Sequence, residues 1–262
     1  MVSLPILGER YQLRQRIGRG GMAFVYSAWD TRLLCEVAVK IIKPALSADG
    51  TICARFSREA AITCQLHHPN IMSIYNHGVA DGLPYLVMPL IEGLSLKQLL
   101  QSGQLPNQQA VEIFMQTCDA IGYAHSKGVA HGDIKPANIL VSPKNHVILT
   151  DFGLASITGE PPLPHPWGSL HYTAPEQAAG SPPTFRSDVY SLGVILHLLL
   201  AGVLPSGVYP LSSPTLPKEF QPVLTKALAK NPADRFSDAR EMHADCVSAS
   251  QPVAKPKSHP DG

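Results

Sequence analysis

The chain has 262 residues, of which 45% are hydrophobic and 16% are charged, and its formal net charge is +1. This composition is typical of a globular protein with a sizeable core and excludes a disordered chain. The small net charge gives no basis for a nucleic-acid partner or a membrane-surface partner.

Two further global features bear on location. The longest apolar run, residues 192–204, contains His197 and is shorter than the roughly 20 residues of a membrane span. It therefore predicts a buried helix and no membrane span. No signal peptide opens the chain, and the cysteines form no C-x-x-C pair, so we expect reduced thiols in a cytoplasmic protein. The five cysteines are at positions 35, 53, 64, 118 and 246. No pattern in the sequence sets an oligomeric state.

The first segment, residues 11–43, is predicted to form strands around a glycine-rich turn. The turn, residues 17–26, contains Gly18, Gly20 and Gly21. Glycines let backbone N–H groups approach phosphate oxygens without a Cβ in the way. On its own, this turn fits both a nucleotide site and an ordinary hairpin.

The strand predicted at residues 36–42 carries a lysine, Lys40. Because side chains alternate along a strand, Lys40 shares one face with Ala38, and the other face is apolar, with Val37, Val39 and Ile41. An inward lysine on such a strand is costly unless it is paired. Lys40 is therefore either an edge-strand lysine that reaches solvent or the member of a buried pair.

A helical run at residues 55–66 ends at His67-His68-Pro69-Asn70 and precedes a strand predicted at residues 71–75. The adjacent histidines lack further Cys or His residues at ligand spacing, so we interpret them as a turn and not as a metal site.

The middle of the chain reads as a buried strand followed mainly by helices. The strand covers residues 85–88. Helices are expected at residues 95–100, with Ser95 as a cap, and at 106–127, where Gly128 can end the helix. Further helices are expected from Ser187, over 220–230 and over 236–246.

The most informative stretch is residues 131–138, HGDIKPAN, followed by Asp151-Phe152-Gly153. One carboxylate can take the proton of an attacking hydroxyl. The asparagine and the second aspartate can hold Mg²⁺ against a triphosphate, and the lysine can meet the charge on the moving phosphate. This set is a signature of phosphoryl transfer.

These motifs occur in the order and at the spacings of a known family. From about Tyr11 to Asp245, the chain resembles a eukaryotic-like, bacterial-type Ser/Thr protein kinase catalytic domain. The resemblance implies an α+β fold of two lobes, with ATP and Mg²⁺ as cofactors and protein substrates as partners. It divides the chain into an N-terminal extension (1–10), a small β-rich N-lobe (11–88), a hinge (89–93), a larger α-helical C-lobe (94–246) and a disordered polar tail (247–262).

The resemblance also assigns roles to residues. Asp133 would orient the substrate hydroxyl and accept its proton, and Lys135 would bridge Asp133 and the γ-phosphate; a lysine there points to Ser/Thr substrates. Lys40 would bind ATP and pair with Glu59. Asn138 and Asp151 would hold Mg²⁺. The remaining ATP contacts would come from Ile17, Gly18, Arg19, Gly20, Gly21, Val25, Ala38, Met88, Pro89, Ile91 and Leu140.

Other matches imply ordering roles. Asp188 would bond the backbone of the catalytic loop, Glu176 would pair with Arg235, and His131 and Phe152 would pack inside the C-lobe.

The chain departs from the family pattern in several places. Gly132 stands where the family usually has an arginine that meets an activation-loop phosphate. In the loop between Gly153 and Gly168, the hydroxyls Ser156 and Thr158 lie early, and four prolines follow. We therefore expect a kinase that lacks this arginine (a non-RD kinase), whose loop is held by proline stiffness and Trp167 packing, with no activating phosphorylation needed.

Two smaller departures remain. Ala23 replaces the third glycine of the turn, and the segment 203–217, where relatives have an additional helix, is short and rich in proline and serine.

Two alternatives stay open. A pseudokinase scaffold would bind nucleotide and partners without catalysis, and Gly132, Ala23 and the short segment favour it slightly. The intact Asp133 and Asp151 argue against it. A small-molecule phosphotransferase of related fold would have no reason to keep the peptide-side motif Ala174-Pro175-Glu176.

Overall fold

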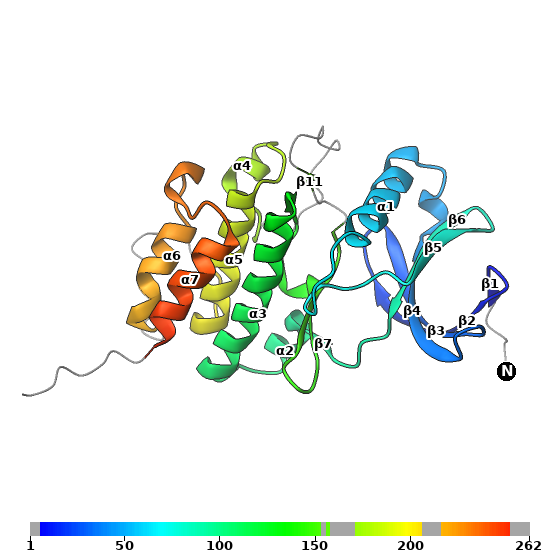
Figure 1. The fold of residues 1–262 in the computed structure, drawn as a ribbon, viewed down its shortest axis with the longest axis horizontal. Coiled ribbons are helices and arrows are strands. Elements are labelled where there is room, and N and C mark those ends of the chain that lie inside the picture. Colours follow the sequence, from blue (N-terminus) through cyan, green and yellow to red (C-terminus); the bar gives the residue numbers. More distant parts are fainter. Residues whose placement is uncertain (1–5, 153–155, 158–170, 206–215, 252–262) are drawn as a thin grey trace, which may run out of the picture.

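A computed structural model describes residues 6–152, 156–157, 171–205 and 216–251. Figure 1 shows two lobes, one built on a β-sheet with a single α-helix against it, and one built from helices. The predicted α+β, two-lobed fold is confirmed. No helix within the described ranges has the length and apolar character needed to cross a bilayer.

The sheet of the N-lobe has the strand order β1-β2-β3-β4-β6-β5, and all its pairs are antiparallel. Two smaller sheets have the orders β10-β9-β7 and β11-β8. The strands are β1 (Ile6–Leu7), β2 (Tyr11–Arg19), β3 (Ala23–Asp30), β4 (Cys35–Ile42), β5 (Asn76–Ala80), β6 (Leu83–Pro89), β7 (Leu94–Ser95), β8 (Val129–Ala130), β9 (Ile139–Val141), β10 (Val147–Leu149) and β11 (Ser156–Ile157).

The helices belong mostly to the C-lobe. The α-helices are α1 (Gly50–Thr63), α2 (Leu96–Gln101), α3 (Asn107–Ser126), α4 (Pro175–Ala178), α5 (Phe185–Ala201), α6 (Gln221–Ala227) and α7 (Ala239–Ser250). Short 3₁₀ turns lie at Pro44–Leu46, Pro136–Asn138, Lys218–Phe220 and Pro232–Asp234.

The alternation predicted for β4 is confirmed. Val37, Val39 and Ile41 pack into one hydrophobic cluster. Ala38 packs on the opposite face, in the cluster that receives Phe56 of α1. The strand thus separates a core inside the N-lobe from a second core between the sheet, α1 and the C-lobe.

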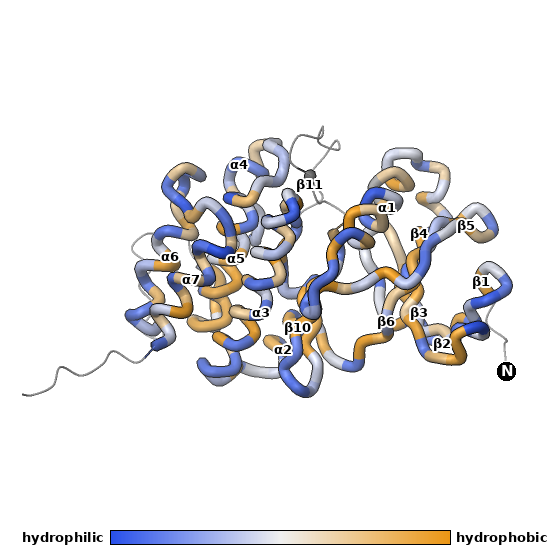
Figure 2. Tube along the Cα trace, in the orientation of Figure 1, coloured by the Kyte–Doolittle hydropathy of each residue, from blue (hydrophilic) through white to orange (hydrophobic). Residues whose placement is uncertain are grey.

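Helix α5 forms the centre of the C-lobe and is buried along most of its length. It contacts α3, α6 and α7, and hydrophobic colours prevail along it in Figure 2. Thr184 and Ser187 form a reciprocal capping box at its start, and Gly202, at φ +74°, ends it in a left-handed conformation that glycine adopts without strain. The predicted buried helix is confirmed.

Side-chain caps also explain where other helices begin. The Ser95 hydroxyl accepts the backbone N–H of Gln98, and the Gln98 side chain accepts the backbone N–H of Ser95, which forms a capping box. The predicted cap of α2 is therefore confirmed. Helix α1 begins at Gly50, earlier than predicted, because Asp49 accepts from the N–H groups of Thr51 and Ile52.

The strand predicted at residues 71–75 is wrong, and the structure forms β5 at Asn76–Ala80 instead. The reason is a long-range pairing. The N–H of Leu149 donates to the carbonyl of Asn70 at 2.8 Å, and the N–H of Met72 donates to the carbonyl of Leu149 at 2.9 Å. The segment after Asn70 therefore bonds to the C-lobe and joins the N-lobe sheet only further along.

Both ends of the described chain differ from expectation in detail. Strand β1 pairs with β2 in the N-lobe sheet, within the predicted N-terminal extension. Helix α7 continues to Ser250, beyond the predicted end at Cys246 and into the first residues of the predicted tail. Residues 252–262 lie outside the described residues.

Arg10 and Asp30 join this N-terminal arm to the sheet. Asp30 is 1% exposed and accepts two bonds of 2.8 Å from the Arg10 guanidinium. It also accepts the N–H groups of Arg32 at 2.9 Å and Leu33 at 3.1 Å. The bonds from Arg10 and these N–H groups lower the pKa of Asp30 to about 2.

We predict that Asp30→Asn lowers the free energy of unfolding by about 2 kcal/mol at pH 7, because hydrogen bonds to an ionised group are lost. A lowered folded-state pKa stabilises the protein above the unfolded-state pKa and loses that effect as pH falls. The difference from wild type, measured by urea unfolding, should therefore shrink as pH falls from about 4 to about 2. Asp81→Asn in the β5–β6 turn is the control, and a difference that persisted unchanged at pH 2 would contradict this account.

Candidate active site

The glycine-rich turn connects β2 and β3. The N–H of Gly20 donates to the carbonyl of Ala23 at 2.9 Å, and the Lys43 ammonium donates to the carbonyl of Gly21 at 2.6 Å. Ala23 is buried in the cluster beneath the sheet and pairs with Ile42 of β4. The methyl group that replaces the family's third glycine therefore packs into the lobe.

The apolar residues predicted to contact adenine come together from both lobes. Val25, Ala38, Met88, Ile91 and Leu140 belong to one cluster. Pro89 lies beside them as the last residue of β6, paired with Val37. Ile17 is outside this cluster and 49% exposed. The structure thus brings together apolar residues of β3, β4 and β9, and Ile17 lies outside this cluster.

Lys40 is the member of a buried pair, as the resemblance implied. Its Nζ lies 2.7 Å from Glu59 of α1 and also contacts the carboxylate of Asp151. Burial opposes the charge on Lys40, but the two carboxylates outweigh it and raise the pKa of the lysine. Burial raises the pKa of Glu59, whereas Lys40 holds the pKa of Asp151 below its ordinary value against the effect of burial.

The carboxylate of Asp133 is held by two neighbours. Its Oδ2 lies 2.5 Å from Nζ of Lys135 and 3.1 Å from Nδ2 of Asn138. Burial raises the pKa of Asp133, and Lys135 opposes this shift. A carboxylate with a raised pKa is a better proton acceptor than a solvated one.

Asp188 of α5 holds the backbone just before Asp133. Its carboxylate accepts the N–H of His131 at 2.7 Å and the N–H of Gly132 at 2.9 Å. It also accepts Nε2–H of His125 at 3.0 Å, and the other ring nitrogen of His125 accepts the N–H of Ala239 at 3.2 Å. The predicted bonds from Asp188 to the loop are present, and His125 extends them to the start of α7.

His131 is a packing and ordering residue, as expected. Its ring lies 4.5 Å from the ring of Phe152. Nε2 donates to the carbonyl of Thr150 at 3.1 Å, because a carbonyl can only accept, and Nδ1 accepts the N–H of Asp133 at 3.2 Å. The ring therefore connects the catalytic loop to the segment that carries Asp151.

Asn138 and Asp151 fit a magnesium site. Asn138 directly precedes β9, Asp151 follows β10, and these two strands pair. The N–H of Thr150 donates to the carbonyl of Asn138 at 2.9 Å. The side chains of Asn138 and Asp151 therefore start from adjacent stretches of backbone. The Nδ2 group of Asn138 donates to Asp133, which leaves its amide oxygen as an acceptor. One carboxylate, one amide oxygen and substrate phosphates are the oxygen ligands that Mg²⁺ prefers.

An ion pair between buried Arg235 and half-buried Glu176 anchors the segment that carries the predicted peptide-side motif. Arg235 donates two bonds to Glu176, of 2.7 and 2.9 Å, so the predicted pair is present and bidentate. Ser191 of α5 donates to the carbonyl of Tyr172 at 2.7 Å. The segment 171–177 is thereby attached to the helical core.

Sequence reasoning missed three residues that order this site: His125, Thr150 and Gln177. The helical pattern of residues 106–127 places His125 on a helix but does not indicate its partners. The amide of Gln177 donates to the carbonyl of Gly132 at 3.3 Å. Its only sequence signal is its place directly after Glu176, and a buried position for a polar amide cannot be inferred from that alone.

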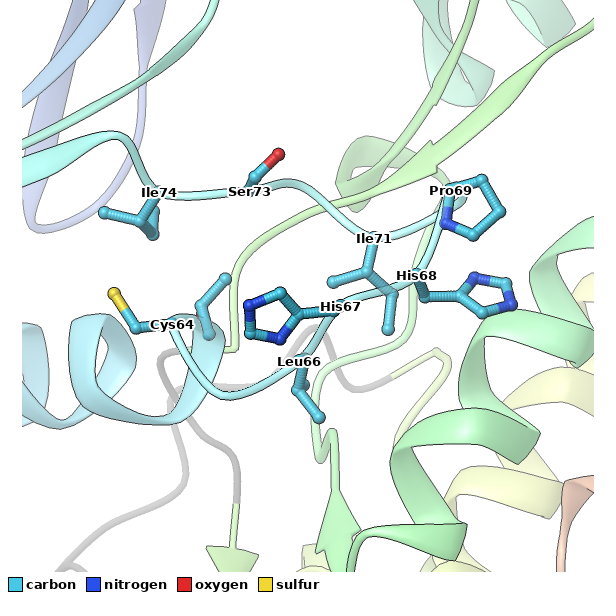
Figure 3. A pocket seen from close by; sticks show the side chains of 9 residues that line it. Cys64, Leu66, His67, His68, Pro69, Ile71, Ser73 and Ile74 are labelled. Atoms are coloured by element: carbon cyan, nitrogen blue, oxygen red, sulfur yellow. The ribbon is translucent and has the colours of Figure 1, made fainter.

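A cavity of about 340 Å³ lies elsewhere, at the C-terminal end of α1 (Figure 3). The N–H of His67 donates to the Tyr123 hydroxyl at 3.1 Å, and His68 lies 3.2 Å from Asp119, so this segment is attached to α3. The cavity belongs to the joint between the lobes and contains none of the predicted site residues. It is lined by Thr63, Cys64, Leu66, His67, His68, Pro69, Ile71, Ser73 and Ile74.

Part of the predicted loop can be followed. Ser156 lies in β11 and pairs with Ala130 of β8. Thr158 and Trp167 lie outside the described residues, as do positions 206–215 of the short segment.

Comparison with known proteins agrees with this geometry. The family model of the protein kinase domain matches residues 11–247. The chain is 38% identical to the serine/threonine-protein kinase PknB of Mycobacterium leprae, over 98% of this chain and 46% of that protein. It is also 38% identical to the serine/threonine-protein kinase PrkC of Bacillus subtilis, over 93% of this chain and 41% of that protein. The chain thus spans less than half the length of these curated relatives.

Among solved structures, the crystal structure of the PknI kinase domain of Mycobacterium tuberculosis superposes with a TM-score of 0.77 at 29% identity, covering 95% of this chain and all of that one. The chain therefore belongs to the protein kinase domain family. Within that family it is a catalytic domain of the bacterial Ser/Thr type.

We predict that Asp188→Asn destabilises the fold by about 2–4 kcal/mol, because an asparagine oxygen cannot accept all three bonds and its NH₂ group would face donors. Urea unfolding measures the effect, with Asp245→Asn at an exposed position of α7 as the control. Equal unfolding midpoints for the two variants would show that the Asp188 bonds are not needed for stability.

Proposed function

We propose that this chain transfers the γ-phosphate of Mg·ATP to serine or threonine hydroxyls of proteins. The observation that carries the proposal is the convergence of two constellations: Lys40 between Glu59 and Asp151, and Asp133 between Lys135 and Asn138. The first suits a triphosphate with its metal and the second suits an incoming hydroxyl. The relatives, named as serine/threonine-protein kinases, support the same conclusion.

In the proposed reaction, the substrate hydroxyl oxygen attacks the γ-phosphorus. The new O–P bond forms as the bond from the γ-phosphorus to the bridging oxygen of ADP breaks. The hydroxyl proton passes to the carboxylate of Asp133. The bond from Asn138 orients this carboxylate, and burial raises its pKa. Lys135, 2.5 Å from Asp133, lies beside the charge on the transferring phosphate.

Lys40 would bind the phosphates of ATP, and Glu59 would keep the lysine in place. Asn138 and Asp151 would hold Mg²⁺, which would neutralise charge on the phosphates when bound. In the structure Asp151 contacts Lys40. A bound metal would compete for the carboxylate and the ATP phosphates would compete for the ammonium, so this contact would rearrange.

We further propose a non-RD kinase that needs no activation-loop phosphate. Gly132 offers no guanidinium to meet such a phosphate. The bonds from the N–H groups of His131 and Gly132 to Asp188 order the catalytic loop without a phosphate. The scattered free thiols support a reducing, cytoplasmic location.

The first test is transfer of labelled γ-phosphate from Mg·ATP to a generic basic protein and to the chain itself. We expect Asp133→Asn to lower kcat by about 10²–10⁴-fold, because the proton acceptor is lost, with ATP binding retained. Asp151→Asn should abolish transfer and weaken the dependence of nucleotide binding on Mg²⁺, and exposed Asp245→Asn is the control. A wild-type protein that binds ATP without transfer would be a pseudokinase, and transfer only to small alcohols would indicate a small-molecule phosphotransferase.

The second test treats purified, active protein with a phosphatase, which is then removed. We expect the initial rate of transfer to be unchanged, because Gly132 leaves no arginine to receive a loop phosphate. Ser156→Ala should likewise retain activity. A loss of activity that returns on incubation with ATP would refute activation-loop independence and leave kinase activity itself established.

A further inference from the structure

Side chains hold several backbone groups next to Asp133. The N–H groups of His131 and Gly132 donate to Asp188, and the N–H of Asp133 donates to the ring of His131. The carbonyl of Asp133 accepts Nδ2 of Asn138 at 2.9 Å. The carbonyl of Gly132 accepts the Nε2–H of Gln177 at 3.3 Å.

Gly132 makes this last bond important. Its φ is +80°, a conformation that glycine reaches easily but from which it can also depart at low cost. The peptide plane between Gly132 and Asp133 is fixed at one end by His131 and at the other by Gln177. If the carbonyl were released, this plane could rotate and take the Asp133 side chain with it.

Gln177 comes from the peptide side of the site. It is 6% exposed and follows Glu176, whose pairing with Arg235 anchors α4. The bond from Gln177 therefore connects the segment next to the substrate with the residue that would accept the substrate proton.

We propose that Gln177 is a positioning residue for catalysis: its amide fixes the Gly132–Asp133 peptide plane and so couples α4 to the orientation of Asp133. The inference rests on the proposed kinase function and adds a residue to its mechanism.

The test compares Gln177→Met, which keeps the length but removes the donor, with Gln177→Glu, which replaces the donor with an acceptor. Exposed Gln108→Met on α3 is the matched control. Steady-state kinetics are measured for ATP and for a protein substrate, rates are normalised to the concentration of ATP-binding sites, and melting temperatures are recorded. Gln177→Met should lower kcat about 10-fold, as expected for a lost hydrogen bond of about 1.4 kcal/mol, with KM for ATP unchanged.

The pH dependence separates positioning from a merely structural role. When protonated, the carboxyl group introduced by Gln177→Glu is an O–H donor and can restore the bond to the Gly132 carbonyl. When ionised, it repels that carbonyl. Position 177 is buried, and burial raises the pKa of the introduced carboxyl. The ratio of the kcat of Gln177→Glu to that of wild type should therefore rise several-fold as pH falls from about 8.5 to about 6, whereas the ratio for Gln177→Met should stay constant.

The inference fails if both variants have wild-type kcat per binding site and only their melting temperatures change, or if the two ratios follow the same pH dependence. Should Gln177→Met not fold, Gln177→Asn, whose amide is one methylene too short, takes its place with the same expectation. Absence of transfer by the wild type would instead refute the proposed function, so the two failures are distinguishable.

Discussion

The buried carboxylate of Asp188 is the interaction on which the site depends most. It takes three donors at once, two from the catalytic loop and one from His125. A carboxylate with almost no exposure is tolerable only when its hydrogen bonds are satisfied, and here the donors come from backbone that must lie in one place. Satisfying Asp188 thus fixes the position of Gly132 and, through it, of Asp133. Asp188 belongs to α5, which is buried along most of its length. The catalytic loop is therefore fixed to the core of the C-lobe.

Lys40 makes the corresponding connection between the lobes. Its strand belongs to the N-lobe sheet, Glu59 belongs to α1, and Asp151 belongs to the C-lobe. An ammonium buried between two carboxylates is stable only while all three elements keep their places, because removing either partner leaves an uncompensated charge. The apolar cluster around Val25, Ala38 and Leu140 closes the same joint from the side where adenine would bind.

Backbone strain occurs within this assembly. Asp151 has φ +65°, a conformation that is unfavourable for a residue with a Cβ and that persists where the surroundings determine it. Those surroundings are the ion pair to Lys40 and the ring contact between His131 and Phe152. Gly132, at φ +80°, reaches a similar conformation without such a cost. The two residues flank the region where phosphate and hydroxyl would meet, and the structure holds both by contacts from distant elements.

The sequence by itself determined the faces of β4, the capped start of α2 and the central buried helix. Each of these follows from a local pattern: alternation, a capping residue or a long apolar run. The ordered motifs also led to the two lobes and to the pairs Lys40–Glu59 and Glu176–Arg235, because a recognised family supplies an architecture and partners that spacing alone does not. Only the tertiary structure decided that residues 70–72 bond to Leu149, that β1 joins the sheet and that Gln177 reaches Gly132. Such contacts join residues that are far apart in the chain. The partner of each group depends on which elements pack around it, and a local periodicity carries no information about that packing.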